Sequence, residues 1–364
     1  MEGFDSVAAL PRTAPGAPWD PVPVGYLDAC SMGLPLASTL AAMRDGLAAW
    51  GEGRASAAAY AAVVERSRAL FARIVGVPTA RVSIGATASD LVAPIAASLP
   101  DGSAVLCAEG DFSSIVYPFM QHGDRGVAVA HAPLESLADA IRPGTALVSF
   151  SLVQSADGRI ADVEAILAAA HDAGALVLCD LTQAAGAYPV DAARFDFTVC
   201  HTYKWLCAPR GVAFLTSAPE AAARVVPLAA GWYAGERIWE SCYGPEMRLA
   251  ADARRFDSSP AWLSWVGAEP ALEHFARADI RASSARCVGL ADGLLGLLGL
   301  EPRGQYIVAL DDPDGERAAA LDASGVRFAR RAGRVRLGFH AWNTEDDVDL
   351  VAAALAPLRR PRVA

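Results

Sequence analysis

The chain has 364 residues, 53% of them hydrophobic, and a formal net charge of −10. This length is enough for a sizeable core and for two domains. The acidic balance argues against nucleic acid as a partner, and no apolar run in the sequence reaches the length of a membrane span.

The start of the chain, MEGFDSVAAL, has no basic region followed by an apolar core. No signal peptide is therefore evident, and we expect a cytoplasmic protein. The seven cysteines are scattered and form no C-x-x-C pair. Several of them lie in apolar runs, which is typical of reduced thiols in a core, so we expect neither disulfides nor a metal site.

The first half of the chain predicts strands alternating with helices after an irregular start. Residues 1–24 carry five prolines and are expected to form an arm or loop. Apolar spacing predicts helices over 36–50, 57–75, 89–99 and 163–173, and strands over 82–85, 104–108 and 145–151. This alternation favours a mostly parallel sheet with helices on both faces.

The stretch 175–215 places polar side chains at the ends of three apolar runs. Strands are expected over 175–179, 197–200 and 212–215. The polar residues at their ends are Asp180, Gln183, His201, Tyr203 and Lys204. Charged groups at buried strand ends cost desolvation free energy, and in an open α/β sheet those ends are where ligands bind.

Pyridoxal phosphate is a cofactor that needs such residues. Its aldehyde condenses with a lysine amine, and Lys204 is the only lysine in the chain. Its ring stores electrons when the pyridine nitrogen is protonated, which a carboxylate such as Asp180 ensures. Gln183 is placed to donate a hydrogen bond to the phenolic oxygen of the ring. The sequence therefore predicts pyridoxal 5′-phosphate as cofactor, with Lys204 and Asp180 as catalytic residues.

These residues also carry a resemblance to a known family. The run D-L-T-Q, the P-V-D after it, the F-D-F strand and the lysine followed by P-R-G resemble the class V aminotransferases of fold type I. That family includes cysteine desulfurases, kynureninases, isopenicillin-N-epimerase-like enzymes and sulfoxide lyases of ergothioneine synthesis. The resemblance covers about residues 26–358. It implies an α/β, aspartate aminotransferase-like fold, with an N-terminal arm (1–24), a large cofactor-binding domain (25–262) and a small α+β domain (263–364).

The resemblance implies further cofactor contacts. Gly85, Ala86 and Thr87 correspond to the turn that holds the phosphate, and a helix N-terminus suits that role. The ring that stacks on the pyridine face corresponds to Phe112, and the contact to the ring oxygen to Ser155 or Gln154. His201 and Tyr203 lie where the family places phosphate ligands. Ser259, in R-F-D-S-S-P, corresponds to a residue that reaches the phosphate of the neighbouring subunit, which implies a homodimer with shared active sites.

The C-terminal part predicts an α+β domain and the substrate-binding residues. A long helix is expected over 264–298 and others over 315–323 and 344–355, with strands over 306–310, 326–329 and 335–339. The family keeps an arginine for the substrate carboxylate, and counting back from Arg336 places it at Arg331, with Arg330 as the adjacent alternative. Tyr26 at the site entrance and Trp232 in an aromatic-rich segment are the other expected substrate contacts.

The cofactor leaves the reaction open. No cysteine follows Cys287, and the connection between Ala329 and Val335 is short, so a mobile loop with a nucleophilic cysteine is not expected. We therefore favour a lyase that cleaves an amino-acid substrate at Cβ, at a C–S or related bond, after its amine forms a Schiff base with the cofactor. Epimerase, aminotransferase and cyclase activities are the alternatives, and a degenerate fold used only for binding is the non-enzymatic one.

Overall fold

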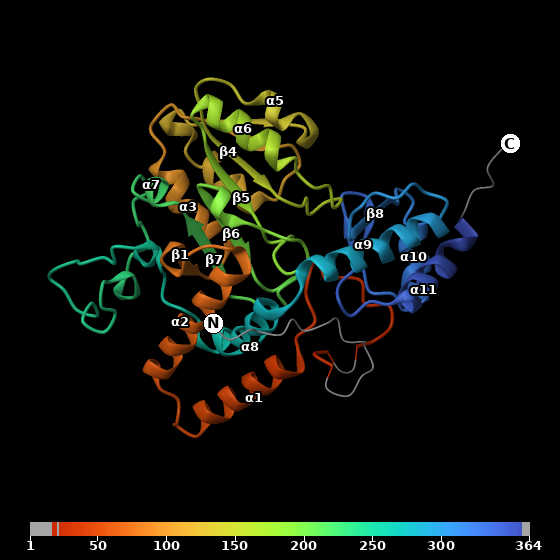
Figure 1. The fold of residues 1–364 in the computed structure, drawn as a ribbon, viewed down its shortest axis with the longest axis horizontal. Coiled ribbons are helices and arrows are strands. Elements are labelled where there is room, and N and C mark those ends of the chain that lie inside the picture. The colour runs from red at the N-terminus through yellow and green to blue at the C-terminus, as the bar shows by residue number, and fades with distance from the viewer. Residues whose placement is uncertain (1–16, 20–21, 359–364) are drawn as a thin grey trace.

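The computed structural model describes residues 17–19 and 22–358. A larger α/β domain and a smaller C-terminal domain lie side by side (Figure 1). Most of the predicted arm, 1–24, lies outside the described residues. The larger domain is built on a seven-stranded sheet of order β1-β7-β6-β5-β4-β2-β3. Within it only β7 runs antiparallel to its neighbours, which confirms the mostly parallel sheet.

The bounds of the elements are close to those expected from the sequence. The strands of the large sheet are β1 (Val82–Gly85), β2 (Ala104–Ala108), β3 (Ala128–Ala132), β4 (Thr145–Ser151), β5 (Leu176–Asp180), β6 (Phe197–His201) and β7 (Ala213–Ser217). The helices up to the domain junction are α1 (Ala37–Gly51), α2 (Ala57–Val75), α3 (Ala88–Ser98), α4 (Tyr117–Met120), α5 (Leu137–Ala140), α6 (Val163–Ala173) and α7 (Pro219–Ala222). Strand β3 and the short helices α4, α5 and α7 have no counterpart in the sequence prediction.

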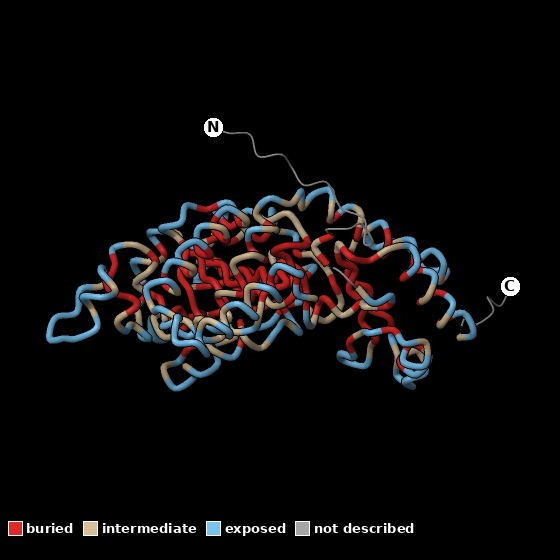
Figure 2. The backbone as a smooth tube through the Cα atoms, turned by 90° about the horizontal axis from the view of Figure 1, so that it is seen from below, coloured by how far each residue is buried: buried red, intermediate tan, exposed pale blue. Residues whose placement is uncertain are grey.

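The central strands are apolar on both faces because helices cover both faces. Along β4, Leu147 packs into one hydrophobic cluster, whereas Val148 and Phe150 pack into the other. The first cluster includes side chains of α3, α4 and α7, and the second includes side chains of α2, α5 and α6. Two-sided burial explains why these strands read as continuous apolar runs and were predicted closely. Figure 2 shows the buried residues concentrated along the middle of both domains.

The C-terminal part corrects one predicted helix. The expected long helix over 264–298 is two helices, α8 (Trp262–Arg277) and α9 (Ile280–Leu297). Ala278 between them is extended, and the Asp279 carboxylate accepts a hydrogen bond from the backbone N–H of Ala282 at 3.0 Å. Asp279 therefore caps a new helix, a role that apolar periodicity does not reveal.

The small domain contains a three-stranded antiparallel sheet of order β8-β10-β9. Its remaining elements are β8 (Ile307–Asp311), α10 (Glu316–Ala323), β9 (Ala329–Arg331), β10 (Arg334–Gly338) and α11 (Glu345–Leu355). The strand predicted over 326–329 is displaced, because Tyr26 forms a parallel bridge with Arg327, and regular pairing with β10 begins only at Ala329. A tight turn with positive φ at Ala332 and Gly333 joins β9 to β10, so this connection is as short as expected.

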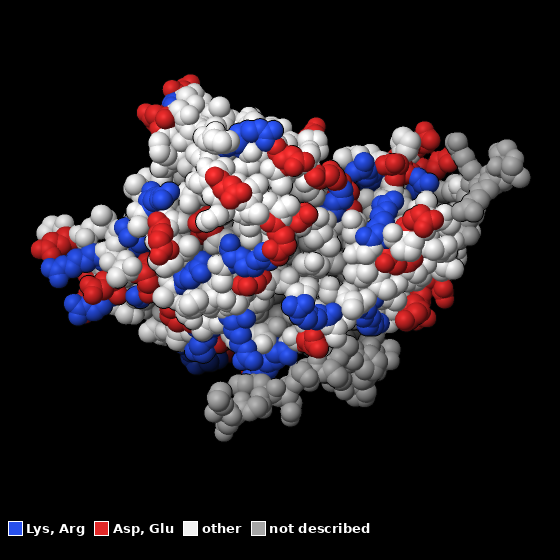
Figure 3. Space-filling model, turned by 45° about the horizontal axis from the view of Figure 1, so that its top comes forward, with Lys and Arg blue, Asp and Glu red and all other residues white. Residues whose placement is uncertain are grey.

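The surface of the larger domain carries one projecting segment and a mixture of charges. Residues 226–250 extend away from the sheet at the left of Figures 1 and 2 and are mostly exposed. Basic and acidic side chains are interspersed over the face shown in Figure 3. Because Lys204 is the only lysine and is buried, the basic groups on this surface are arginines.

Candidate active site

Two parallel strands bring Asp180 and Lys204 to the same edge of the sheet. Asp180 is the last residue of β5, and Lys204 follows the end of the neighbouring β6 by three residues. The side chains of Asp180 and Lys204 are only 4% and 5% exposed. One carboxylate oxygen of Asp180 accepts a hydrogen bond from the backbone N–H of Thr182 at 2.7 Å. The predicted carboxylate and amine are therefore buried together at the strand ends, where ligands bind in such sheets.

Burial moves both groups toward neutrality. Desolvation raises the pKa of Asp180 to about 6 and outweighs its hydrogen bonds to Thr182 and the attraction of Lys204. Desolvation also lowers the pKa of Lys204 to about 8, helped by the Arg336 guanidinium and opposed by Asp180. About a tenth of the Lys204 amine is thus uncharged at pH 7, far more than at the ordinary lysine pKa. An uncharged amine is the nucleophilic form that condenses with an aldehyde.

A tight turn after β6 holds Lys204 in place. Cys207 adopts a left-handed conformation with φ of 54°, and its backbone N–H donates to the Lys204 carbonyl at 3.2 Å. The Thr202 hydroxyl closes the turn on the Val212 carbonyl at 2.9 Å. Gly33 packs directly on this turn, and a Cβ there would lie 1.9 Å from the Lys204 carbonyl oxygen. Only glycine fits at position 33, so the segment before α1 closes against the lysine.

The predicted phosphate-binding residues lie at the start of α3 and the end of β6. Thr87 is the N-cap of α3, and its hydroxyl accepts from the backbone N–H of Asp90 at 3.2 Å. Helix α3 packs on β6 and β7. His201 is buried, and neither of its ring nitrogens has a hydrogen-bond partner among the described residues. Burial, together with Arg210 and Lys204, lowers the pKa of His201 to about 4, so its ring is neutral at pH 7 and keeps one N–H to donate.

Aromatic rings flank the lysine. The Nζ of Lys204 lies 5.3 Å from the ring centre of Phe112 and 5.7 Å from that of Tyr203. Phe112 is 45% exposed, so one side of its ring is free to stack on a ligand. The carboxylate of the preceding Asp111 holds this loop against the end of β4, where it accepts hydrogen bonds from Ser151 and Gln154.

The structure separates the roles of Gln154 and Ser155. Gln154 is 1% exposed, and its amide donates to Asp111 and to the Ser151 carbonyl, so it braces the loop. Ser155 lines the pocket, and its hydroxyl is 3.1 Å from Nε2 of Gln183. Of the two residues that the sequence left open for the ring-oxygen contact, Ser155 is the one beside Gln183.

A pocket of about 410 Å³ lies beside Lys204, whereas Thr87, Asp180, Gln183 and His201 are not among its lining residues. Its lining includes Phe112, Ser155, Tyr203, Lys204, Arg210, Arg331 and Arg336, together with residues 30–33 and the first turns of α1. Tyr26 and Trp232 are not among the lining residues. The Tyr26 hydroxyl donates to the Met32 carbonyl at 2.9 Å and so supports the entrance segment, whereas Trp232 packs on Tyr233 and Trp239 in the projecting segment.

Arg336 is a pocket residue that the sequence reasoning used only as a reference point. It is 1% exposed, and its guanidinium donates to the hydroxyls of Ser155 and Ser31, both at 3.0 Å. Its Nε has no hydrogen-bond partner in the described part of the chain. Arg331 is exposed at the rim of the same pocket, and the side chain of Arg330 pairs with Asp322 instead. The sequence signal that could have identified Arg336 as a buried site residue is its position between Val335 and Leu337 in an apolar strand.

Ser259 is exposed, but its segment is anchored to the phosphate-binding side. Asp257, two residues earlier, is buried and forms an ion pair with Arg68 at 2.7 Å. Its other oxygen accepts from the backbone N–H of Ile84 in β1 at 2.8 Å. This pair fixes the segment leading to Ser259 relative to the strand that leads to Thr87.

The thiols near the lysine are not activated. Cys30 and Cys207 line the pocket, and Cys200 lies in β6. All three are buried, and desolvation raises the pKa of each thiol above its usual value. Cys207 is 1% exposed and lies in the turn that follows Lys204. Among the described residues no helix is long and apolar enough to cross a membrane, and no cluster of side chains is suited to hold a metal ion.

Comparison with known proteins gives consistent matches. The family model for class V aminotransferases matches residues 46–307. YcbU, an uncharacterised aminotransferase of Bacillus subtilis, is 28% identical over 320 residues, which cover 79% of this chain and 83% of the relative. A kynureninase of Deinococcus radiodurans is 30% identical over 278 residues, 72% of this chain and 66% of the relative.

Solved structures match over the same extent. The cystine C-S lyase C-DES, in complex with its product cysteine persulfide, has a TM-score of 0.82 and 20% identity, covering 92% of this chain and 97% of that one. The cysteine desulfurase CsdA of Escherichia coli has a TM-score of 0.78 and 19% identity, covering 92% and 94%. At this identity the structures show the fold, which is the fold type I predicted from the sequence.

Proposed function

This chain belongs to the class V aminotransferase family of pyridoxal-phosphate enzymes, and we propose that it is a lyase that cleaves an amino-acid substrate at Cβ. The observation that carries the proposal is a pocket in which Lys204 faces the ring of Phe112, a side chain that cannot exchange protons. Such a pocket offers Lys204 as a base, and the ring of Phe112 supplies no second base.

The residues present fit the cofactor. The buried ring nitrogens of His201 without partners, and the start of α3 at Thr87, offer hydrogen bonds to a phosphate. Phe112 offers a face for stacking, and Asp180 an acidic partner for the ring nitrogen. A protonated ring nitrogen beside Asp180 would favour its charged form and offset the desolvation that raises its pKa to about 6.

Each residue then has a defined task. When bound, pyridoxal phosphate supplies an aldehyde for the Schiff base and a ring that stores the electrons released at Cα. Lys204 would provide the amine that holds the cofactor, and its Nζ would be the base that removes the proton from Cα of the substrate. Asp180 holds the proton on the ring nitrogen. Arg336, with Arg331 at the rim, binds the substrate carboxylate, because a guanidinium suits a bidentate contact with a carboxylate.

The surroundings of Lys204 favour cleavage at Cβ over epimerisation and over persulfide formation on the enzyme. Epimerisation with two bases needs an acid–base group on each face of the cofactor ring. Phe112 would stack on one of these faces and leave no room there for such a group. Persulfide formation on the enzyme needs an accessible thiolate, whereas the thiols at this pocket are buried with raised pKa values. Removal of the Cα proton by Lys204 followed by loss of the Cβ substituent needs neither group.

A substrate panel tests the reaction. Purified holoenzyme is incubated separately with L-cystine, S-substituted cysteines and L-kynurenine, and with simple amino acids plus a keto-acid acceptor. We expect release of the Cβ substituent from at least one β-substituted amino acid, and no release by Lys204→Ala. Amino-group transfer to the acceptor without loss of any Cβ substituent would establish the aminotransferase alternative.

We also propose a homodimer with shared active sites. Ser259 is exposed, and the projecting segment carries Tyr243 and Met247 with 91% and 77% of their surface exposed. Helix α1, which lines the pocket, exposes Leu47 and Trp50. Aromatic and methionine side chains are more frequent at interfaces than on the rest of a protein surface. Sedimentation gives the mass, and mixing Lys204→Ala with Ser259→Ala chains should restore part of the activity only if each site uses both chains.

A further inference from the structure

The side-chain amide of Gln183 is fixed by an indole. Gln183 is 3% exposed. Its Nε2 donates to the Cys30 carbonyl at 3.0 Å and to the Ser155 hydroxyl at 3.1 Å, and its Oε1 accepts from Nε1 of Trp205 at 2.7 Å. Trp205 directly follows Lys204 in the chain. The residue after the lysine therefore contacts the residue expected at the ring oxygen of the cofactor.

The indole and the Cys30 carbonyl together determine which end of the amide faces Ser155. An indole N–H only donates, and a backbone carbonyl only accepts. A reversed amide would place its NH₂ group against the N–H of Trp205 and its oxygen against the carbonyl of Cys30. Both contacts would be repulsive, so the observed orientation, with Nε2 beside the pocket residue Ser155, is the one that Trp205 and Cys30 allow.

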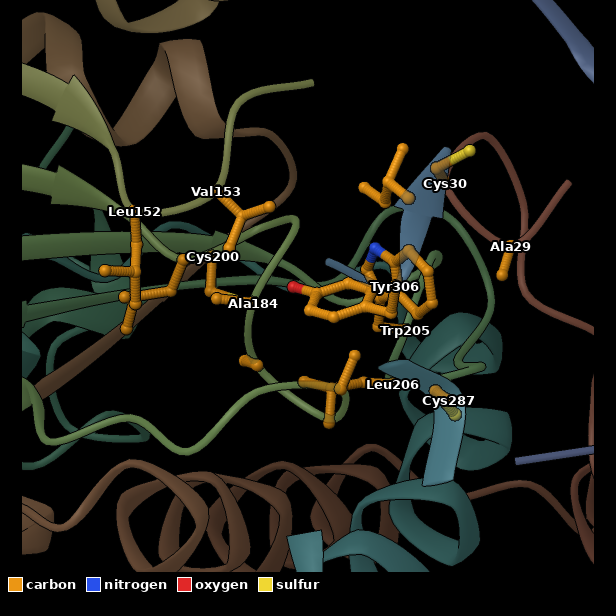
Figure 4. Close-up of a cluster of buried hydrophobic side chains, with 14 of the residues drawn as sticks. Ala29, Cys30, Leu152, Val153, Ala184, Cys200, Trp205, Leu206, Cys287 and Tyr306 are labelled. Carbon is orange, nitrogen blue, oxygen red and sulfur yellow. The ribbon is translucent and has the colours of Figure 1, made fainter. Parts of the chain in front are cut away.

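The indole itself cannot turn away. Trp205 is completely buried, packs edge-on against Tyr306 with ring centres 4.9 Å apart, and stacks on His340 at 5.4 Å. Figure 4 shows the Trp205 and Tyr306 rings in contact below Cys30. The Tyr306 hydroxyl donates to the backbone carbonyl of Gln183 at 2.7 Å. The rings of the small domain thus hold both Trp205 and the backbone of Gln183.

His340 fixes the backbone of Trp205. Its Nδ1 accepts from the N–H of Ala341 at 2.6 Å, so the ring proton is on Nε2. That Nε2 lies 2.9 Å from the Trp205 carbonyl oxygen and donates to it. Burial lowers the pKa of His340 to about 4, so this neutral arrangement persists at pH 7. Indole and carbonyl of Trp205 are therefore both held.

We propose that Trp205 is a positioning residue that orients the Gln183 amide, so that the N–H that Nε2 donates here to the Ser155 hydroxyl would be donated to the phenolic oxygen of pyridoxal phosphate when the cofactor is bound. The proposal rests on the proposed function only in requiring the cofactor at Lys204. A hydrogen bond donated to the ionised oxygen stabilises its charge. The stabilised oxygen holds the neighbouring Schiff-base proton less tightly, so the Schiff base with Lys204 loses that proton at a lower pH.

The test is a pH titration of the absorbance of the Schiff base in the holoenzyme. Trp205→Phe keeps an aromatic ring but removes the donor that fixes the amide. We expect its Schiff-base pKa to rise by about one unit, the size of one hydrogen bond to a charged group. The matched control is Trp342→Phe, which removes an indole N–H on the other side of His340, where Nε1 donates to the Tyr26 carbonyl at 3.1 Å. The control should titrate like the wild type.

A double variant separates positioning from a general packing effect. Gln183→Ala should raise the pKa at least as much as Trp205→Phe does, because the Cys30 carbonyl still holds Nε2 when the indole N–H is lost. Adding Trp205→Phe to Gln183→Ala should change the pKa no further. Shifts that add, or a Trp205→Phe protein that titrates like the wild type, would overturn the proposal while leaving the cofactor site intact. A wild-type protein without Schiff-base absorbance would instead refute the proposed function, and this inference with it.

Gln183→Glu tests the same geometry with Trp205 in place, and so serves if Trp205→Phe does not fold. A glutamate accepts from the indole but has no N–H to offer the ring oxygen. Its Schiff-base pKa should therefore rise above that of the wild type. An unchanged or lower pKa would show that Gln183 does not donate to the ring oxygen, and would overturn the role given to Trp205.

Discussion

The inner and outer sides of the pocket are built differently. On the inner side, Lys204 and Arg336 line the pocket and Asp180 and Gln183 lie outside its lining; all four side chains are at most 5% exposed and are held by contacts within this chain. On the outer side, Met32 is 61% and Phe112 is 45% exposed. The inner side is held by contacts within one chain, whereas the outer side is open to ligand and, in the proposed dimer, would be open to a neighbouring subunit.

The difference indicates where the structure bears a cost for function. Burying an amine, a carboxylate and a guanidinium opposes folding, and such groups are retained where their chemistry is needed. Exposed apolar side chains on the outer side cost solubility and are compensated only by a covering surface. Substituting the buried polar groups should therefore have large effects on catalysis. Substituting the exposed apolar side chains should have smaller effects, and these should fall on the association of subunits.

Lys204→Ala should have the largest effect, because it removes the only lysine. We expect a loss of at least about a thousandfold in kcat/KM, equivalent to ~4 kcal/mol of transition-state stabilisation. Steady-state assays on any substrate from the panel measure the loss. Retention of more than a tenth of the activity would remove Lys204 from the central role.

Replacing the buried arginine of the inner side should raise KM more than replacing the exposed arginine at the rim. Arg336→Met removes the buried guanidinium, and truncating a buried charge partner costs about 2–5 kcal/mol, so KM should rise at least about thirtyfold. Arg331→Met acts at the exposed rim and should raise KM less than about tenfold. Steady-state kinetics of the two variants, with the amount of bound cofactor measured in each, give the two KM values. A larger effect of Arg331→Met would restore the sequence-based assignment.

The pH dependence of cofactor binding tests the electrostatics of the inner side. The pKa of Lys204 is lowered to about 8, so the reactive amine of the apoenzyme increases about tenfold per pH unit below that value and levels off above it. The initial rate of Schiff-base formation with added pyridoxal phosphate should follow this curve. A rate that keeps rising tenfold per unit through pH 10 would mean that Lys204 retains the ordinary lysine pKa.

The smallest effects are expected on the projecting segment, 226–250. Tyr243→Ser and Met247→Ser change residues that are almost fully exposed in one chain, so the free energy of unfolding of the monomer should change by less than about 0.5 kcal/mol. If these residues lie in the dimer interface, the dimer dissociation constant should rise about tenfold. Sedimentation over a range of concentrations measures it. An unchanged constant would place the interface elsewhere.

Sequence reasoning located the inner side well because its signals are local. Continuous apolar runs ending in polar residues predicted β5 and β6 within one residue, and with them the positions of Asp180 and Lys204. The helix break at Asp279 was missed because an N-cap is a single residue inside a periodic pattern. The burial of Arg336 was missed because it depends on β10 packing beside residues 31 and 155, which are distant in the sequence.

The measurement that tests the account most directly is borohydride reduction of the holoenzyme followed by peptide mapping. Reduction fixes the cofactor to the amine that forms the Schiff base. The structure predicts one modified peptide, containing Lys204, together with loss of the visible absorbance. A reduced protein without attached cofactor, or with the cofactor on the N-terminal amine instead of Lys204, would contradict the assignment of this pocket as the active site.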